Sequence, residues 1–373
     1  MKVVGEDRSA EIAEDEGSRQ QKRQKRDKKV VWINLREEPL VYINGKPFVL
    51  RDEHASTRNL TAFAGIVPER LEELELRLKE DVLSEALEYG GKILLHGEGE
   101  NAEILPVWEE VDAAHVQTPR EVFDSLAALG HNLAYHRVPI TAGEPPEAGD
   151  FDALVRIICQ STNFDDLSFV FNCQMGIGRS TVGEAVAVLI LDWMNVIKIS
   201  TEKADKTLFH QQYEVVVSLL RVIRSASEAK KKVDMAIDMC ASFINLREII
   251  SDTMAEAQSE SDEATKKSSL RKGVTLLKRY FWLIAFKGYL NDTPADNLRE
   301  MDTFTSWVQH RLEIEHMTTK IEENHYSALQ PIHDVGHANG NALEEEVAIA
   351  LNTRSGEGNF VVMLFYLKFF LST

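Results

Sequence analysis

The chain of 373 residues is 44% hydrophobic and carries a formal net charge of −18 at pH 7, so it can form one large domain or two ordinary ones. This acidic balance excludes a general binder of nucleic acids or of anionic membranes. Three cysteines, Cys159, Cys173 and Cys240, stand at no metal-like spacing, which indicates a reducing compartment without a disulfide framework.

Residues 1–29 are rich in Glu, Arg, Lys and Gln and nearly free of large apolar side chains, a composition that predicts a disordered charged tail. The first residues are charged rather than apolar, so no signal peptide is predicted. The basic run Lys22–Lys29 fits either a nuclear-localisation patch or a solvated tail. We therefore expect a cytoplasmic protein, with the nucleus as a second compartment.

Residues 30–66 have the pattern of short strands. Apolar and polar residues alternate from Val30 to Leu50, and Pro39 and the pair Asn44-Gly45 are turn signals. This segment therefore predicts two or three strands joined by tight turns.

Helix and strand patterns alternate between residues 67 and 171. Thr118-Pro119 opens one helix with a capping box, and Gly130 closes it. Such alternation predicts a mostly parallel sheet with helices on its faces, in which ligands bind beyond the carboxyl ends of the strands. The predicted elements are helix Pro68–Tyr89, strand Lys92–His96, a helix from Thr118 to Gly130, strand Asn132–Val138, helix Asp150–Gln160 and strand Leu167–Phe171.

The rest of the chain has a helical pattern. A cluster of aromatic and aliphatic residues at Phe281, Trp282, Ile284 and Phe286 favours a buried core over a binding surface. The acidic, serine-rich stretch Ser251–Ser269 predicts an exposed loop. The predicted helices are Arg179–Val196, Ala204–Arg224, Ala229–Ile250, Leu270–Leu290 and Asn297–Ile321.

The segment after strand Leu167–Phe171 has the features of an oxyanion-binding loop. Cys173 is followed six positions later by Arg179, with Gly176 and Gly178 between them. The glycines let the backbone fold closely around a phosphate, and N–H groups at a helix N-terminus converge on an anion. The same groups and the guanidinium stabilise a thiolate. A bare Cys-x5-Arg also occurs by chance around inert buried cysteines, but this setting predicts a cysteine-dependent phosphatase.

Each residue of this loop has an expected role. Cys173 attacks phosphorus, and Arg179 offers a planar fork to two phosphoryl oxygens. Ser180 hydrogen-bonds the sulfur and eases its departure from a phospho-cysteine. The predicted phosphate-binding residues are Gln174, Met175, Gly176, Ile177, Gly178, Arg179 and Ser180.

The loop resembles that of the cysteine-dependent phosphatase superfamily. Within it, Phe171–Gly176 is similar to the paladin-like proteins, which are related to the tyrosine-phosphatase-like inositol phosphatases, or phytases. Val31–Pro39, Tyr42–Phe48 and Lys278–Phe286 support this resemblance, which runs from about residue 30 to about residue 355. It implies a protein-tyrosine-phosphatase-like three-layer α/β fold with a helical C-terminal half. Asn172 stands where most of the superfamily has His, as in paladin-like sequences.

The resemblance also implies a domain layout. A phosphatase-like domain covers residues 30–320, with N-terminal strands at 30–66, an α/β core at 67–200 and a helical part at 201–320. Residues 321–373 form a C-terminal extension, and they are either a last buried element or the start of a truncated next repeat. The apolar run Phe360–Leu371 has about twelve residues, too few to span a bilayer.

Hydrolysis of a phosphomonoester also requires a general acid that protonates the leaving oxygen. In the related phytases, an Asp follows a Pro-hydrophobic-Thr segment. Here that segment is Pro139–Thr141, and Ala142 stands at the Asp position. Glu144 is the predicted substitute. Three further acidic residues are candidates, although the last two fit the cap and start of the next helix: Glu147, Asp150 and Asp152.

The resemblance further implies that Arg36 and Glu37 brace the loop or face the ligand, with a surface ion pair as the alternative. No metal or other cofactor is predicted, because the histidine pair His333 and His337 lies among glycines that disfavour a helix.

Two functions fit these observations. The first is a phosphatase that works through a phospho-cysteine, for which the resemblance implies phosphorylated inositols, phosphoinositides or phosphotyrosine protein as substrates. The second is a catalytically weak pseudophosphatase that binds a phosphorylated small molecule or phosphoprotein. Ala142 favours the second function, whereas the intact pair Cys173 and Arg179 favours the first, which we expect.

Overall fold

The computed structural model describes residues 28–50, 63–98, 104–200, 213–241, 244–295, 302–323 and 325–330. The predictions for the tail at residues 1–27, for His333 and His337, and for the run Phe360–Leu371 lie outside these ranges. Within them, no helix is both long and apolar enough to cross a membrane.

The central sheet has three parallel strands. Strand β1 (Lys29–Asn34) lies between β7 (Leu133–Arg137) and β8 (Leu167–Asn172). The register aligns the last residue of β1, Asn34, with Arg137 on one side and with Asn172 on the other. The three carboxyl ends therefore form one edge of the sheet, and Cys173 follows directly from it.

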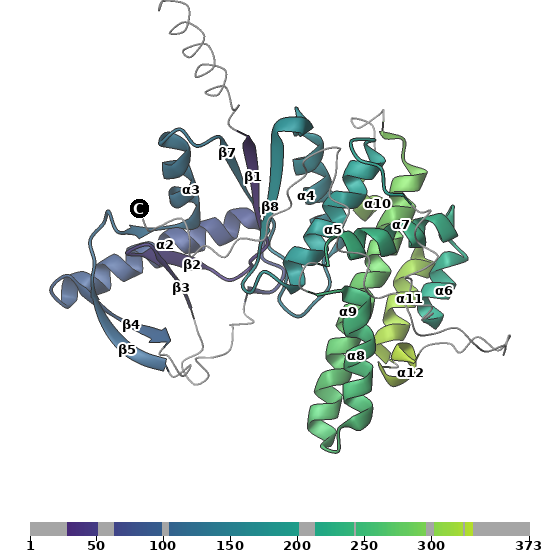
Figure 1. Ribbon diagram of the computed structural model, residues 1–373. Coiled ribbons are helices and arrows are strands. Elements are labelled where there is room, and N and C mark those ends of the chain that lie inside the picture. The colour runs from purple at the N-terminus through teal and green to yellow at the C-terminus, as the bar shows by residue number, and fades with distance from the viewer. Residues whose placement is uncertain are drawn as a thin grey trace, which may run out of the picture.

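Helices cover both faces of this sheet, as its alternating side chains require (Figure 1). On one face, Phe123 of α3 (Pro119–Ala128) packs against Trp32, with ring centroids 5.0 Å apart, and against Tyr135, at 4.4 Å. On the other face, Val31 and Ile33 join the main core, to which α4 (Ala148–Cys159) and α5 (Gly178–Trp193) also belong. This arrangement of helix, sheet and helix confirms the predicted α/β class.

A smaller antiparallel part lies beside the central sheet. Strands β2 (Leu40–Ile43), β3 (Lys46–Val49) and β6 (Val116–Gln117) form one sheet, and β4 (Lys92–Glu98) and β5 (Ile104–Glu110) form a hairpin. Helix α2 (Pro68–Glu88) adds Val82 to the small core that these strands share. Asn44 and Gly45 both have positive φ, 50° and 76°, as a two-residue hairpin turn requires.

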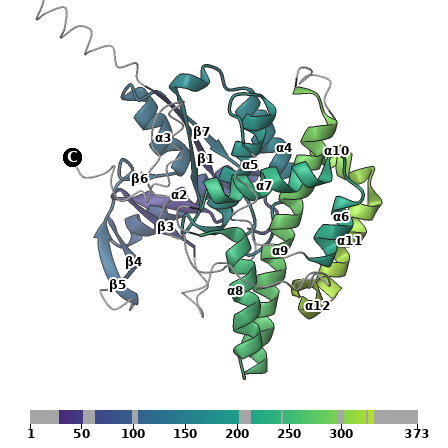
Figure 2. The ribbon, with the colours of Figure 1, turned by 45° about the vertical axis from the view of Figure 1, so that its right-hand side comes forward.

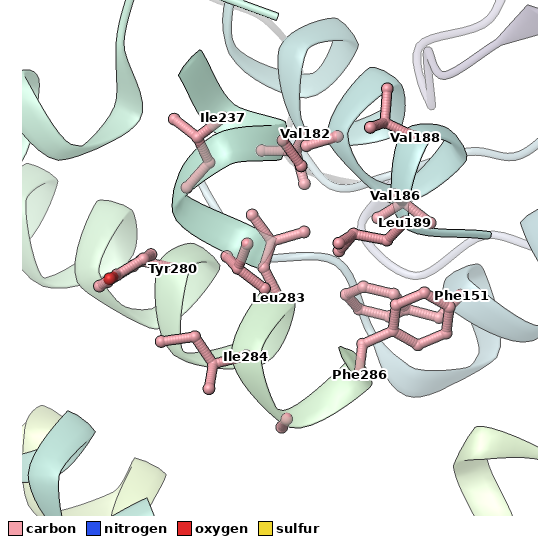
Figure 3. Close-up of a cluster of buried hydrophobic side chains, with 14 of the residues drawn as sticks. Phe151, Val182, Val186, Val188, Leu189, Ile237, Tyr280, Leu283, Ile284 and Phe286 are labelled. Atoms are coloured by element: carbon pink, nitrogen blue, oxygen red, sulfur yellow. The ribbon is translucent and has the colours of Figure 1, made fainter. Parts of the chain in front are cut away.

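The C-terminal half is helical (Figure 2). Its elements are α6 (Glu214–Leu220), α7 (Ala226–Met239), α8 (Leu246–Ser259), α9 (Glu263–Asp292), α10 (Phe304–Gln309), α11 (Leu312–Glu323) and α12 (His325–Leu329). The long helix α9 joins this half to the sheet, because its Phe286 packs against Phe151 of α4 with ring centroids 4.9 Å apart (Figure 3). Phe281, Ile284 and Phe286 are fully buried, which confirms their prediction as core.

Three predictions for the helical half are wrong. The predicted helix Asn297–Ile321 is not continuous, because α10 ends at Gln309 and α11 begins at Leu312. Ser251–Ser269 is not a loop, because α8 continues to Ser259 and α9 begins at Glu263. Its acidic and serine residues lie on the outer side of α8, while Ile250, Met254 and Ala257 continue a buried stripe. The single predicted helix Ala229–Ile250 is two helices, and the Asn245 side chain caps the second by accepting from the Arg247 N–H at 3.0 Å.

Candidate active site

Residues 173–179 connect strand β8 to helix α5 and form the loop that the sequence singled out. Gly176 has a φ of 72°, a conformation that favours glycine. Helix α5 begins at Gly178, so Arg179 and Ser180 lie in its first turn and are buried, whereas Met175 is 62% exposed. Cys173 itself is half-buried. The loop thus presents a partly accessible thiol at the positive end of a helix.

The pKa of the Cys173 thiol is lowered from its ordinary value. Burial by itself would raise this pKa, but hydrogen bonds from the Ser180 hydroxyl and backbone N–H, the charge of Arg179 and the Gly176 N–H outweigh it. Burial instead raises the pKa values of the other two thiols, to about 11 for Cys159 and about 12 for Cys240. Cys173 is therefore the one cysteine whose surroundings favour the nucleophilic thiolate.

The Ser180 hydroxyl acts on the sulfur of Cys173. It is fully buried and, among the described residues, has no partner that meets regular hydrogen-bond geometry. It nevertheless contributes to the lowered pKa of Cys173, so it faces the sulfur. A buried hydroxyl left without a partner would be destabilising, and a thiolate at position 173 supplies that partner.

Arg179 is held from behind the loop. Its Nη2 lies 3.1 Å from Oε1 of Glu38, and its Nη1 donates to the Ile140 carbonyl at 2.9 Å. Arg179 and Arg36 together hold the pKa of Glu38 low, against the effect of burial. Because each Nη carries two hydrogens and Nε carries one, the guanidinium retains donors that can bind an oxyanion.

A buried arginine shapes the segment that carries Glu38. Arg137, at the end of β7, donates from Nε to the Arg36 carbonyl at 2.8 Å and from Nη2 to the Glu38 carbonyl at 3.3 Å. Its Nη2 also lies 3.2 Å from Oε1 of Glu75 on α2, and both side chains are buried. The turn after β1 is thus fixed by Arg137 of β7, which is itself paired with Glu75 of α2.

Of the two alternatives for Arg36 and Glu37, the surface ion pair is excluded, because Glu37 is only 4% exposed. Arg36 pairs with Glu38, at 3.4 Å, rather than with Glu37. The Glu37 carboxylate accepts the N–H of Ala142 at 2.6 Å. Both residues brace the site, and Glu38, which sequence reasoning missed, holds Arg179.

Asn172, which stands before the nucleophile, connects the ends of the parallel strands. Its Oδ1 accepts from Trp32 Nε1 at 2.6 Å, and its Nδ2 donates to Asn34 Oδ1 at 3.2 Å. Asn34 in turn donates to the Tyr135 hydroxyl at 3.0 Å. These amide contacts fix β1, β7 and β8 relative to one another directly below Cys173.

The segment Thr141–Glu144, expected to carry the general acid, lies against the loop. Gly143 has a φ of 82°, and the side chains of Ala142 and Glu144 are exposed. The Glu144 carbonyl accepts from Nε and Nη2 of Arg279 at 3.3 and 3.0 Å. The backbone of Glu144 is therefore linked through Arg279 to the surroundings of the loop, and whether its side chain acts as the acid stays a prediction.

The other acidic candidates have structural contacts. Asp152 accepts the Phe304 N–H at 2.6 Å and the Thr305 N–H at 3.1 Å, so it caps α10. Asp150 accepts the Glu147 N–H at 2.8 Å at the start of α4. Burial, together with the charges of Glu147 and Glu37, raises the pKa of Asp150 to about 7.

Arg279 of α9 is a site residue that the sequence did not identify. It is 8% exposed, and its Nη1 lies 3.3 Å from the position that a Cβ on Gly178 would take. Its 106-residue distance from Cys173 along the chain hides this proximity. The only available signal was an arginine on the apolar stripe of a helix, which requires a buried anion or carbonyl as its partner.

Comparisons with known proteins agree with the predicted resemblance. Residues 33–191 match the sequence model of the PTP-like phytase family, which carries the description inositol hexakisphosphate. Paladin of Gallus gallus is 29% identical over 297 residues, which are 75% of this chain and 32% of that protein. Paladin of Homo sapiens is 29% identical over 300 residues, 76% of this chain and 31% of that protein. The chain thus spans about a third of the length of these curated relatives.

Two solved structures match much of the chain at low sequence identity. The PTP-like myo-inositol phosphatase of Mitsuokella multacida, in complex with myo-inositol-(1,3,4,5)-tetrakisphosphate, is 13% identical with a TM-score of 0.47 and covers 79% of this chain and 38% of its own. The PTP-like phytase of Bdellovibrio bacteriovorus is 14% identical with a TM-score of 0.41 and covers 78% of this chain and 81% of its own.

The family match includes the 173–179 loop, the bracing residues Arg36–Glu38 and the segment Thr141–Glu144. Similarity to paladin extends this relationship over three quarters of the chain. The predicted resemblance is therefore confirmed: the chain is similar to paladin, and its residues 33–191 match the PTP-like phytase family model.

Proposed function

We propose that this chain is a cysteine-dependent phosphoric monoester hydrolase that acts through a phospho-cysteine. The observation that supports this proposal best is the lowered pKa of Cys173, caused by donors from Ser180 and Gly176 and by Arg179 against the effect of burial. Inert buried cysteines have raised pKa values, as Cys159 and Cys240 do here.

The proposed reaction has two steps. In the first, the Cys173 thiolate attacks phosphorus, the P–O bond to the leaving group breaks, and that oxygen takes a proton from Glu144 or from water. In the second, water attacks phosphorus and the P–S bond breaks, which yields inorganic phosphate and regenerates the thiolate. Arg179 and the backbone N–H groups stabilise the charge on the phosphoryl oxygens in both steps, and Ser180 stabilises the departing sulfur.

The proposed substrates are phosphorylated inositols or phosphoinositides, with phosphotyrosine protein as a second class. The description of the matched family, inositol hexakisphosphate, supports the first class. The cytoplasm, with the nucleus as a second location, is the proposed compartment, and the three free thiols support reducing conditions.

A pseudophosphatase that binds its phosphorylated ligand without turnover is the second candidate. One observation favours it, namely the exposed Ala142 at the expected position of the acid. General acid catalysis typically contributes about 10² to 10⁴ in rate, so its loss would leave phosphate binding intact while turnover became very slow.

The two candidates are separated by an aryl phosphate with a good leaving group, because such a substrate needs no general acid. We expect turnover of this substrate by the wild-type chain and, in Cys173→Ser, a fall by about 10³ or more. Cys159→Ser is the matched control, since Cys159 lies outside the loop with a raised pKa. Wild-type turnover no faster than that of Cys173→Ser would reject the enzyme. Saturable binding of inositol hexakisphosphate without release of phosphate would then support the binding function.

A further inference from the structure

Arg279 stands out because it is a buried guanidinium next to the 173–179 loop that, in the described part of the chain, has no carboxylate partner. Among the described residues, its partner is the Glu144 carbonyl, and no acidic side chain lies within ion-pair distance. The other arginines near the loop each have a carboxylate partner, since Arg179 and Arg36 share Glu38 and Arg137 pairs with Glu75.

The surroundings of Arg279 make this placement costly. Arg279 lines a small, partly open pocket of about 50 Å³ between α5, α7, α8 and α9, together with aliphatic side chains such as Ile237, Leu276 and Leu283. Moving an unpaired cation into such surroundings is unfavourable. Burial and the charge of Arg179 accordingly lower its pKa to about 10, while Cys173 and Glu144 act in the opposite direction. The guanidinium remains charged at neutral pH, and an anion at the loop would compensate it.

We propose that Arg279 is a positioning residue that clamps the segment Thr141–Glu144 onto the 173–179 loop and supplies the loop with a positive charge that has no carboxylate partner. The clamp consists of the two hydrogen bonds to the Glu144 carbonyl. The charge acts on the Cys173 thiolate and on a phosphoryl group bound above it. Because α9 belongs to the helical half, this residue makes the loop depend on a part of the chain outside the family match at residues 33–191. The proposal deepens the proposed function and rests on the same site.

The two roles predict different results for two variants. Arg279→Gln removes the charge and weakens the hydrogen bonds to the Glu144 carbonyl. Arg279→Lys retains the charge, but a lysine ammonium lacks the planar pair of N–H donors with which arginine binds that carbonyl. Arg271→Gln is the matched control, because Arg271 is an exposed arginine on the same helix.

The first measurement is the pH dependence of the rate at which iodoacetamide alkylates Cys173, which requires no turnover. The groups that interact electrostatically or by hydrogen bonds with this sulfur include Arg179, Ser180 and Arg279, with Glu144 adjacent to Arg279. Loss of one positive charge raises the pKa of the thiol, so we expect Arg279→Gln to shift the profile by about half a pH unit or more to higher pH. Arg279→Lys and Arg271→Gln should remain close to wild type.

The second measurement is protection of Cys173 from alkylation by inorganic phosphate. Arg279→Gln should require about threefold or more phosphate for half-protection, because a charge near the oxyanion has been removed. Hydrogen exchange at the amides of residues 142–144 should become faster in both Arg279 variants, since both lose the two-donor clamp.

An alkylation profile and a phosphate requirement for Arg279→Gln equal to those of Arg271→Gln would overturn the proposal, and so would unchanged exchange at residues 142–144. If Arg279→Gln does not fold, Arg279→Lys still tests the clamp through hydrogen exchange. A chain that hydrolyses no substrate but shows these shifts would reject the proposed function and support the role of Arg279.

Discussion

Cys173 is distinguished from the other two cysteines by what donates to its sulfur rather than by its depth. All three thiols are at least partly buried, and burial alone would raise each pKa. At position 173, two donors from Ser180, one from Gly176 and the charge of Arg179 reverse that effect. A change to any of these groups should therefore appear as a change in the pH at which the thiol reacts.

Ser180→Ala tests whether the Ser180 hydroxyl stabilises the Cys173 thiolate. The variant removes the hydroxyl that faces the sulfur, and a hydrogen bond to a charged group contributes about 1.5 kcal/mol. We expect the pKa of Cys173 to rise by about one unit, so its alkylation profile moves to higher pH. The control is Ser161→Ala, whose hydroxyl donates to the Ile157 carbonyl at 3.1 Å away from the loop. Superimposable profiles for the two variants would show that Ser180 does not stabilise the thiolate.

Ala142→Asp tests the missing acid. The side chain of Ala142 is exposed while its N–H is held by Glu37, so a carboxyl can be added without a clash. For a phosphate ester with a poor leaving group, we expect kcat to rise about tenfold or more, within the usual range of general acid catalysis. The gain should disappear as the pH rises through the pKa of the new carboxyl, because only its protonated form donates. Aryl phosphates with good leaving groups should gain little, and an equal gain in Ala142→Asn would contradict the acid role.

At the scale of elements, the site depends on how closely α5 approaches the sheet. Gly183, one turn after Arg179, allows this approach, because an added Cβ would lie 2.8 Å from Leu35 Cδ1 and 2.9 Å from Phe171 Cδ1. Leu35 precedes the bracing residues and Phe171 belongs to β8. A displaced α5 would therefore move the donors of its first turn away from the end of β8.

Gly183→Ala should destabilise the fold by about 1 to 3 kcal/mol, as overpacking in a core typically does. The measurement is the midpoint of urea unfolding. Gly149→Ala in α4 is the control, because nothing lies within 4 Å of its added Cβ. A Gly183→Ala midpoint equal to that of Gly149→Ala would mean that α5 has room to move.

At the scale of the whole molecule, the helical half is attached to the sheet through α9 and α10. Helix α9 contributes Arg279 to the loop and Phe286 to the core around Phe151. Asp152 of α4 caps α10 through the N–H groups of Phe304 and Thr305. The proposed boundaries at residues 30, 200 and 320 stay predictions, yet these contacts show that residues on either side of position 200 share one core.

Asp152→Ala should loosen this attachment. Loss of the cap leaves two buried N–H groups without their acceptor, so we expect a decrease of about 1 to 2 kcal/mol in the free energy of unfolding. Asp152→Asn retains an acceptor oxygen and should lose about half as much. The alkylation profile of Cys173 should remain unchanged in both variants, because the groups that lower the pKa of this thiol lie on the loop and α5 rather than on α10. A shifted profile would show instead that Asp152 influences the site directly.

The sequence by itself determined the α/β class, most elements up to residue 200 and the loop from Cys173 to Arg179. The reason is that these features are local, namely hydrophobic periodicity, caps, turn residues and a short motif between a strand and a helix. It also indicated the helical half, although it misplaced the boundary between α8 and α9, where charged residues on the outer side concealed the buried stripe.

Only the tertiary structure decided which distant side chains serve the loop. Glu38 rather than Glu37 holds Arg179, Asp152 caps a helix instead of facing the site, and Arg279 reaches the loop from α9. Such partnerships depend on how strands and helices are packed. Unlike buried apolar residues, paired charges do not recur at a regular spacing along the sequence, so the sequence alone does not predict them. The identity of the loop is therefore encoded locally, whereas its electrostatics depend on the assembled fold.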